Sequence, residues 1–351
     1  MENHEFFMQR CLDLAIKGLG TTAPNPMVGA VLVYEGKIIG EGFTSPHGSS
    51  HAEVNAIHSV KDQSLFKKCT LYVSLEPCSH FGKTPPCSNL IIEKEIPRVV
   101  IGTEDTFSKV NGNGIRQLEE NGVHIISRIL QKECRDLNKR FFTFHEKKRP
   151  FITLKWAQSA DGLMDKDREK SESKINWITQ PETKNLVHLW RSQEMGILVG
   201  RKTIENDNPK LDVRLVNGRS PIRLILDPEA KIDLENWTHN QMERTLIFNT
   251  LKNEQSGKIE WIKMPHFNLN EILHECYKRE IQSILVEGGA HTLNEFISTN
   301  LWDEARVLIG ENKFNKGLKA PKIDQPFSKK EKINKDEIWF YTNDLKALHL
   351  L

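Results

Sequence analysis

Long apolar runs, cysteines and a strong net charge are all scarce in this sequence. No apolar segment approaches the ~18 residues that a membrane-spanning helix needs. Six cysteines in 351 residues are too few for a disulfide scaffold, so we expect reduced thiols and a cytoplasmic protein. The first residues are polar and acidic, so we expect no signal peptide. Membrane-embedded and disulfide-rich secreted proteins are therefore excluded.

Charge of one sign is lacking as well. The chain has 49 basic residues (Lys and Arg) and 47 acidic residues (Asp and Glu), which leaves a net charge of +2. The balance holds along the chain, with 17 basic and 17 acidic residues through Lys147 and 32 and 30 after it. Proteins that bind nucleic acid concentrate basic residues in a patch or arm. We therefore expect neither nucleic acid nor a membrane as a partner.

The apolar pattern predicts an α/β unit in the first half, with helices that cover a mixed sheet. Glu35-Gly36 separates its first two strands and predicts a hairpin. Lys147–Pro150 is a short polar break, so we expect domains at 1–147 and 151–351. The expected strands are 28–34, 37–42, 70–75, 98–102 and 123–129, and the expected helices are 4–19, 53–60, 88–96, 115–121 and 131–145.

The second half has the pattern of another α/β unit. The segment 313–336 holds eight lysines and few apolar residues, and this composition predicts a solvent-exposed loop. The expected strands are 151–157, 196–199, 222–226, 245–249, 259–264 and 283–286, and the expected helices are 181–192, 270–281 and 291–299.

A histidine and two cysteines have the pattern of a catalytic zinc site. His51 opens an expected helix, and Cys78 and Cys87 flank a loop that follows an expected strand. Three protein ligands leave the fourth position on zinc open to water, whereas structural zinc sites usually take four protein ligands. Glu53 lies two residues after His51, where it can move a proton from that water to the substrate. The order H-x-E, P-C and C is typical of zinc-dependent nucleobase deaminases, although eight residues separate the two cysteines instead of two.

Two other interpretations stay open at this point. The first is a zinc nucleoside or tRNA deaminase joined to an unrelated ligand-binding domain; the balanced charge and the long loop between the cysteines disfavour it. The second is a structural zinc module on a ligand-binding domain. This module would need a fourth protein ligand, for which His80 is the candidate in the loop.

The second half lacks a G-x-G-x-x-G segment after its first strand, so a Rossmann dinucleotide site has no support. Residues 285–292, LVEGGAHT, instead predict a buried strand that passes through two glycines into a helix. Glycines let the backbone approach a ligand closely, and the start of a helix offers free N–H groups to phosphate. This turn is therefore a candidate nucleotide-binding element.

Several strings together resemble one family, the bifunctional deaminase/reductases of riboflavin biosynthesis. In the first half they are Asn25-Pro26-x-Val28-Gly29, His51–Asn55 and EPCSHFGKTPPC from Glu76 to Cys87. In the second half they are K-x-A-x-S-x-D-G at 155–162, W-I-T at 177–179, Arg191, V-G-x-x-T at 199–203, D-x-P-x-L-x-V-R at 207–214 and E-G-G at 287–289.

This resemblance implies a fold, an activity and two cofactors. The fold would be an N-terminal cytidine-deaminase-like α/β/α domain followed by a C-terminal dihydrofolate-reductase-like domain. The first domain would use one zinc ion to deaminate a phosphoribosylated diaminopyrimidinone. The second would use NADPH to reduce the ribosyl chain of the resulting phosphoribosylaminouracil to ribityl. We expect a homo-oligomer that acts on these small molecules.

The resemblance also assigns residue roles. The deaminase substrate would contact Asn25, His80 and Lys83. The reductase substrate would contact Arg191, Leu211, Arg214 and Glu287, with the two arginines on its phosphate, because guanidinium groups bind phosphate in a planar fork. NADPH would contact Ala157, Trp177, Thr203, Asp207, Gly289, Ala290, His291, Thr292, Leu293, Asn294 and Glu295.

The chain departs from the family pattern at four places. Thr44 replaces a common histidine, and Ile175 and Pro228 each replace a common serine. The segment Asp105–Gly114 keeps the family's glycines but lacks its Pro-Asn-Pro.

Overall fold

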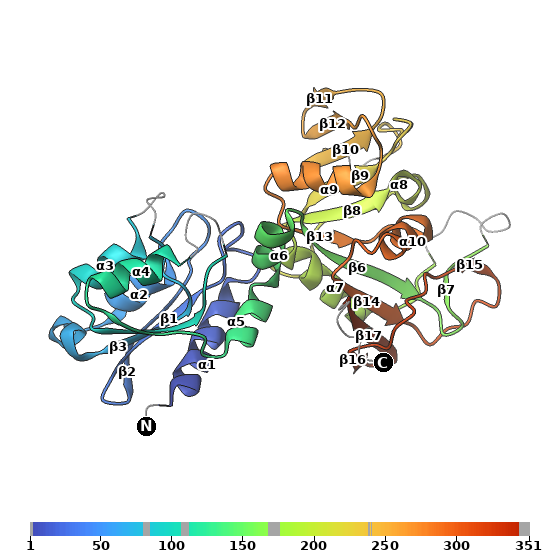
Figure 1. The fold of residues 1–351 in the computed structure, drawn as a ribbon. Coiled ribbons are helices and arrows are strands. Elements are labelled where there is room, and N and C mark those ends of the chain that lie inside the picture. Colours follow the sequence, from blue (N-terminus) through green and yellow to red (C-terminus); the bar gives the residue numbers. More distant parts are fainter. Residues whose placement is uncertain are drawn as a thin grey trace. The chain divides into compact units, whose positions relative to one another are not determined.

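The computed structural model describes residues 3–79, 85–106, 112–167, 176–237, 239 and 241–343. The chain divides into two compact units, Met1–Lys148 and Arg149–Leu351, which Figure 1 shows as ribbons. Among the described residues, no helix has both the length and the apolar character that crossing a bilayer requires.

The first unit is built on a five-stranded sheet in the order β2-β1-β3-β4-β5. β1 is antiparallel to β2 and β3, and β3, β4 and β5 are parallel. Glu35 and Gly36 both have positive φ, as a tight hairpin turn between β1 and β2 requires. The strands are β1 (Gly29–Tyr34), β2 (Lys37–Phe43), β3 (Thr70–Leu75), β4 (Arg98–Thr103) and β5 (His124–Ile126).

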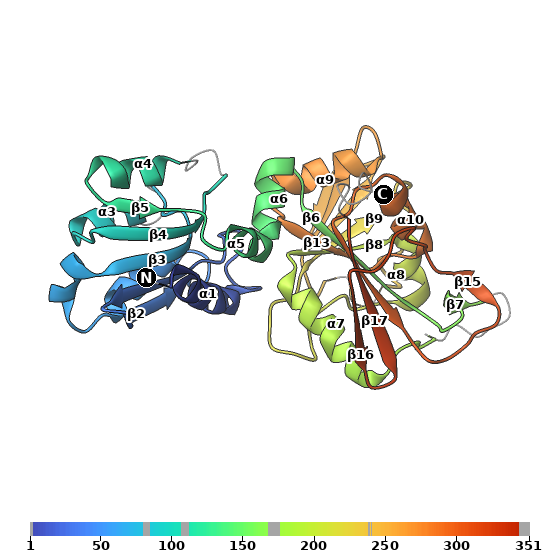
Figure 2. The ribbon, with the colours of Figure 1, turned by 60° about the horizontal axis from the view of Figure 1, so that its bottom comes forward.

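Helices cover both faces of this sheet, because its central strand is apolar on both sides. In β3, Leu71 and Val73 pack in one core with α2, α3 and α4, whereas Tyr72 packs in a second core with α1 and α5. Figures 1 and 2 show α3 and α4 on one face and α1 and α5 on the other. The helices are α1 (His4–Ala15), α2 (Ala52–Ser59), α3 (Cys87–Glu93), α4 (Asn113–Glu120), α5 (Gln131–Leu137) and α6 (Lys139–Lys147), with 3-10 turns at Ile16–Gly18 and Gln63–Lys68. The α/β/α fold expected for this half is confirmed.

The second unit holds a ten-stranded sheet in the order β11-β12-β10-β9-β8-β13-β6-β14-β17-β16. The strands from β12 to β14 are parallel, and antiparallel strands flank them at both edges. A small separate sheet pairs β7 with β15. The strands are β6 (Phe151–Gln158), β7 (Leu163–Lys166), β8 (Gly196–Gly200), β9 (Ile222–Leu226), β10 (Thr245–Asn249), β11 (Glu254–Ser256), β12 (Ile259–Lys263), β13 (Ser283–Val286), β14 (Glu304–Ile309), β15 (Gly317–Lys319), β16 (Lys329–Ile333) and β17 (Asp336–Thr342).

Four helices pack on the large sheet. α9 and α10 pack against one face of the sheet and form its largest hydrophobic core. α7 and α8 pack against the other face, each in a separate smaller core. Glu287-Gly288-Gly289 follows β13 directly and leads into α10, so the turn predicted from the sequence lies at the carboxyl end of a central parallel strand. Ligand sites of parallel α/β sheets commonly lie at this end. The helices are α7 (Pro181–Gln193), α8 (Arg201–Asp207), α9 (Leu269–Lys278) and α10 (Ala290–Ser298).

The prediction that 313–336 forms a loop is wrong in part. This segment contains β15 and β16, and β16 is the outermost strand of the large sheet. The residues of β16 are mostly exposed, so its sequence KKEKI lacks the apolar alternation that predicts a strand. Lysine-rich edge strands of this kind resist pairing with other chains.

Candidate active sites

The first site brings His51, Cys78 and Cys87 together from three separate segments of the first unit. His51 immediately precedes α2, Cys78 lies in the loop after β3, and Cys87 begins α3. His51 Nδ1 lies 3.5 Å from Cys78 Sγ and 3.3 Å from Cys87 Sγ. The three donor atoms lie within 4.8 Å of one another, as ligands of one metal ion must. One imidazole and two thiols therefore fit a zinc ion and leave one tetrahedral position for water.

The pKa values of the two thiols of this site shift in opposite directions. Hydrogen bonds from the Cys87 thiol and from His51 lower the pKa of Cys78 to about 4, and the Cys87 backbone N–H also donates to Cys78 Sγ at 3.3 Å. The hydrogen bond to Cys78 raises the pKa of Cys87 well above its ordinary value. One ligand is thus already a thiolate at neutral pH, the form that binds metal.

Glu53 is buried beside these three residues, with 4% of its surface exposed. Burial raises the pKa of Glu53 to about 7. A carboxyl group with this pKa can both accept and donate a proton near neutral pH. The structure therefore brings the predicted general acid/base and the three predicted ligands into one site.

Of the three residues predicted to contact the deaminase substrate, only Asn25 is among the described residues. His80 and Lys83 lie outside the described residues. Asn25 is half-buried. Two residues further along the chain, the side chain of Asn138 holds the backbone of Met27. The Asn138 side chain accepts from Met27 N and donates to Met27 O, both at 2.8 Å. Asn138 is 2% exposed and separates α5 from α6, where we predicted one continuous helix.

Thr44 has a structural partner. The Thr44 hydroxyl oxygen accepts the Val28 N–H at 3.1 Å, and the Thr44 N–H donates to Val28 O at 2.9 Å. Thr44 and Asn138 therefore hold adjacent residues of the segment that follows Asn25. Asn138 gives no sequence signal, because its partners are backbone groups 111 residues away.

The second site is a cavity of about 740 Å³ in the second unit. It lies where β8, β9 and β13 end and α8 and α10 begin. A Cβ atom built on Gly289 would lie 3.8 Å from Thr203 Oγ1, an ordinary van der Waals distance, whereas one built on Gly288 would lie 2.9 Å from Thr292 Cβ, so the backbone at Gly288 packs too closely for a side chain. The cavity also has two adjacent cations in its lining, Lys202 and Arg201, of which Arg201 is paired with Glu205 and Asp227. The volume of this cavity, the glycine turn and the positive charge in its lining fit NADPH.

The cavity gathers many of the predicted cofactor residues but not all. Its lining includes the predicted cofactor residues Thr203, Asp207, Gly289, Ala290, His291, Thr292 and Glu295, and also Glu287, which was predicted to contact the reductase substrate. The other predicted residues do not line it. Leu293 packs in the main core, Asn294 is exposed on α10, Ala157 packs beside α7, and Trp177 is 58% exposed with the Lys184 ammonium 3.3 Å from its ring centre. Ile175 lies outside the described residues.

Glu287 anchors a buried charge cluster next to the glycine turn. Arg191 donates to both carboxylate oxygens of Glu287, at 2.8 Å each, and Lys155 Nζ lies 3.4 Å from Glu287 Oε2. Burial alone would raise the pKa of Glu287, but the charges of Arg191 and Lys155 outweigh it and lower that pKa to about 2. Burial lowers the pKa of Lys155. Lys155 belongs to a family string in the sequence, but we assigned it no role there.

The remaining predicted substrate residues lie around this cluster. Arg191 also donates to Asp212 O at 3.2 Å, and Arg214 forms an ion pair with the Asp212 side chain. Burial and the charges of Arg191 and Arg214 lower the pKa of His188 to about 4. Leu211 is buried in a neighbouring core. Arg191 is thus committed to Glu287 and Asp212, whereas Arg214 is 45% exposed.

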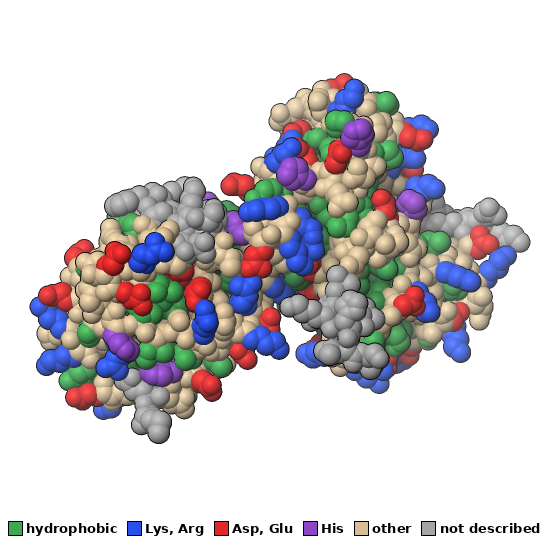
Figure 3. Space-filling model, viewed as in Figure 1, with side chains coloured by type: hydrophobic (Ala, Val, Ile, Leu, Met, Phe, Trp, Pro, Cys, Tyr) green, Lys and Arg blue, Asp and Glu red, His purple; other side chains and the backbone are tan. Residues whose placement is uncertain are grey.

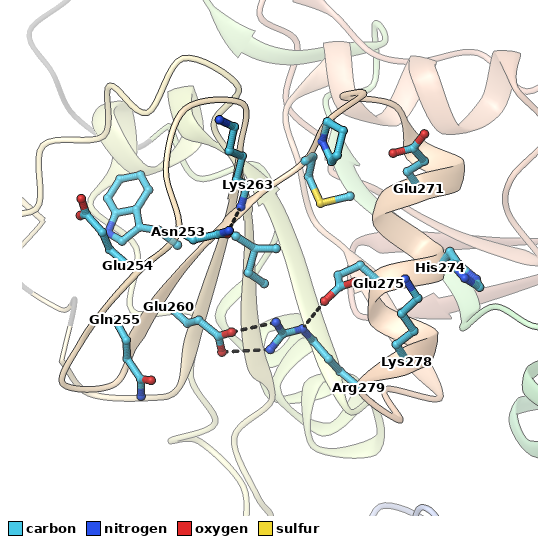
Figure 4. Close-up of a pocket in the computed structure, with 14 residues that line it drawn as sticks. Asn253, Glu254, Gln255, Glu260, Lys263, Glu271, His274, Glu275, Lys278 and Arg279 are labelled. Carbon is cyan, nitrogen blue, oxygen red and sulfur yellow. Dashed lines mark hydrogen bonds and ion pairs between the residues drawn. The ribbon is translucent and has the colours of Figure 1, made fainter.

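A further hollow of about 800 Å³ lies between β11, β12 and α9 (Figure 4). It is lined by none of the predicted residues. Arg279 lies between Glu260 and Glu275 and bonds to both, so the charges that point into the hollow satisfy one another. Nothing in this arrangement indicates a ligand.

These two sites and their folds define a class: a hydrolytic zinc deaminase joined to a nicotinamide-dependent reductase. Residues 1–103 match the cytidine and deoxycytidylate deaminase zinc-binding region, and residues 150–311 match the RibD C-terminal domain. The riboflavin biosynthesis protein RibD of Aquifex aeolicus is 39% identical over 89% of this chain and 88% of its own length. RibD of Escherichia coli is 33% identical over 87% of both chains.

Solved structures agree. A deaminase/reductase from Thermotoga maritima is 36% identical and superposes with a TM-score of 0.85 over 96% of this chain and 97% of its own. RibD of Acinetobacter baumannii, at 24% identity, has the same fold with a TM-score of 0.87. The chain belongs to the RibD family of riboflavin biosynthesis proteins. It is a bifunctional enzyme, a deaminase and a reductase, and its cofactors are zinc and NADPH.

Proposed function

We propose that Met1–Lys148 deaminates a diaminohydroxyphosphoribosylaminopyrimidine and that Arg149–Leu351 then reduces the 5-amino-6-(5-phosphoribosylamino)uracil that results. The solved relative from Thermotoga maritima is named for these two reactions. The observation that carries the proposal is the pairing of sites in one chain. One unit joins His51, Cys78 and Cys87 to a buried Glu53, and the other joins a glycine-lined cavity to a buried Glu287.

In the deaminase, His51, Cys78 and Cys87 would hold the zinc. The bound ion supplies a water whose pKa falls to about 7, so that hydroxide is available to attack the ring carbon that carries the amine. Glu53 would take one proton of that water and give it to the ring nitrogen, and would then take the second proton from the added hydroxyl and give it to the leaving amine. Asn25, His80 and Lys83 hold the pyrimidine and its substituents.

In the reductase, the glycine turn and α10 hold the cofactor. Gly289–Thr292 bring backbone close to it, and Thr203 and Asp207 line the opposite wall. Lys202 supplies positive charge suited to a phosphate group of NADPH, whereas Arg201 is paired with Glu205 and Asp227. Glu295 also lines this cavity, whereas Ala157, Trp177, Leu293 and Asn294, which the family resemblance assigns to NADPH, lie outside its lining. NADPH supplies the hydride, and the protein holds the two reactants in register.

The reduction adds hydride to the sugar carbon that is bound to the amine, and the ring oxygen that leaves this carbon needs a proton. We assign that proton to Lys155, whose pKa is lowered by burial, because Glu287 with a pKa of about 2 stays ionised and has none to give. Arg191 keeps Glu287 ionised and oriented. Arg214, the more exposed of the two arginines, holds the substrate phosphate, and Leu211 closes the pocket beside it.

The distribution of charge on the surface supports an enzyme that acts on small molecules. Basic and acidic side chains are interspersed over both units on the face that Figure 3 shows. We propose that the enzyme works in the cytoplasm as a homo-oligomer, without nucleic acid or membrane partners. Sedimentation of the purified chain tests the oligomer, and a monomer at micromolar concentration contradicts it.

Mass spectrometry of the products tests the proposed reactions. Without NADPH, the phosphorylated diaminopyrimidine should become the deaminated ribosyl compound and stop there. With NADPH, the ribityl compound should accumulate. Recovery of the unchanged substrate in both reactions, from a zinc-loaded protein, contradicts the proposal.

A further inference from the structure

The cavity of the second unit has one lysine in its lining, Lys202. Among the described residues that form this lining, the strong cations are Arg201 and Lys202, the first two residues of α8. The Lys202 side chain is exposed, and no carboxylate in the described part of the chain forms an ion pair with its ammonium group. Its positive charge is therefore available to a ligand in the cavity.

Arg201, the neighbouring cation, is committed to carboxylates of the protein. Its Nε lies 3.2 Å from Oδ1 of Asp227, a residue with no exposed surface, and its Nη1 pairs with Glu205. The carboxylate of Glu229 lies 3.8 Å from its Nη2. Arg201 thus neutralises the acidic groups around the start of α8, so that their charges do not oppose an anion that approaches Lys202.

The sheet places Lys202 between two walls of the cavity. β8 lies between β13 and β9, and these three strands are parallel. Gly200 at the end of β8 pairs with Leu226 at the end of β9, so α8 begins beside Pro228, which also lines the cavity. The glycine turn, Gly288-Gly289, follows β13 on the other side of β8. The carboxyl edge of the sheet therefore presents the glycine turn, the start of α8 and Pro228 in this order.

NADPH carries phosphate at two places, the pyrophosphate and the 2′-phosphate of its adenosine. The glycine turn suits the pyrophosphate, because α10 begins there with free backbone N–H groups that no side chain of its N-cap, Gly289, accepts. The 2′-phosphate is a separate group of nearly two negative charges. Pro228 offers it neither an N–H nor a polar side-chain atom. Of the described lining residues, Lys202 is the cation that remains for it.

We propose that Lys202 binds the 2′-phosphate and thereby makes this enzyme prefer NADPH to NADH. The inference rests on the proposed binding of NADPH in this cavity, and it assigns the phosphate and the residue that determine cofactor choice. The two cofactors differ in this phosphate alone. A contact with it therefore changes their relative affinity, whereas the contacts with the pyrophosphate and the nicotinamide serve both.

The test is isothermal titration calorimetry of the full chain with 2′-phospho-ADP-ribose and with ADP-ribose, which carry the phosphates of NADPH and NADH without the nicotinamide. The wild type should bind the 2′-phosphorylated compound about tenfold or more tightly than ADP-ribose, because a charge-assisted contact is strong. Lys202→Gln should raise the Kd of the 2′-phosphorylated compound about tenfold or more and change the Kd of ADP-ribose less than about twofold.

Two further variants serve as controls. Lys202→Arg keeps the positive charge and should keep most of the preference. Lys210→Gln removes an exposed lysine of the same unit that does not line the cavity, and it should change neither Kd. Because Lys202 and Lys210 are both exposed, these substitutions leave the hydrophobic cores unchanged. In steady-state reduction, Lys202→Gln should raise the KM of NADPH and leave kcat unchanged, since the 2′-phosphate is remote from the hydride.

Equal losses of affinity for both compounds in Lys202→Gln would mean that the lysine binds the pyrophosphate, and this result overturns the proposal. An unchanged preference in this variant overturns it too. A wild type that binds both compounds equally also overturns it, but leaves NADPH in the cavity. A wild type that binds neither compound contradicts both this inference and the proposed cofactor site. If Lys202 determines the preference but the chain reduces no phosphoribosylaminouracil, the proposed reaction fails and this inference stands.

Discussion

Replacing Glu287 by glutamine should destabilise the reductase unit strongly, because it removes the only negative charge between two buried cations in the described cluster. Glu287 is 8% exposed and binds Arg191 at 2.8 Å and Lys155 at 3.4 Å. Folding lowers its pKa from an ordinary 4.5 to about 2. Such a shift corresponds to about 3 kcal/mol of stability at neutral pH. The variant also leaves Lys155 and Arg191 buried without a counter-charge, which acts in the same direction.

The effect should depend on pH with a defined sign. The pKa of Glu287 is lower in the folded than in the unfolded chain, so its contribution is complete above about pH 4.5. It is lost as the pH falls toward 2, where the folded chain also binds the proton. The difference in unfolding free energy between the wild type and Glu287→Gln should therefore be largest near pH 7 and shrink steadily below pH 4.5.

Urea unfolding followed by tryptophan fluorescence measures this difference in the right unit, since all seven tryptophans lie after residue 149. The matched control is Glu260→Gln in the same unit. Glu260 pairs with Arg279 but is 29% exposed, and its loss should cost less than about 1 kcal/mol. Equal destabilisation by the two variants at pH 7, or a difference that grows in acid, would refute the role of the buried cluster.

Two further outcomes follow from the proposed sites. Cys87→Ser should lower the zinc content of the purified chain well below one ion per chain, and elemental analysis that finds stoichiometric zinc argues against the ligand set. Arg214→Ala should raise the KM of reduction roughly tenfold, as loss of a charge-assisted hydrogen bond to phosphate does. It should affect the dephosphorylated substrate far less, and equal losses on both substrates contradict the phosphate contact.

Much of the fold was predictable, because the central strands bury apolar residues. The strands at 70–75, 222–226, 245–249 and 283–286 have the predicted bounds. β16 was missed because it lies at the sheet edge and keeps its lysines exposed. The helix expected over 131–145 breaks at Asn138, whose side chain binds the distant Met27 backbone. That interaction is tertiary and leaves no local pattern.

The site was predictable where chemistry dictates residue types. A zinc ion needs imidazole and thiolate ligands, so His51, Cys78 and Cys87 were identifiable from their order. Arg191 was expected on the substrate phosphate, and the fold binds it also to Glu287, a contact that the sequence did not predict. Which anion an arginine binds depends on the packing of distant strands and helices.

The central claim, that two independent active sites share this chain, is tested most directly by NADPH oxidation in Glu53→Gln. This variant keeps the ligands but cannot shuttle the proton, so deamination should fall by several orders of magnitude. With the deaminated substrate, the variant should oxidise NADPH at the wild-type rate. With the diaminopyrimidine, it should oxidise almost none. Wild-type oxidation with the diaminopyrimidine, or loss of oxidation with the deaminated substrate, would contradict the account.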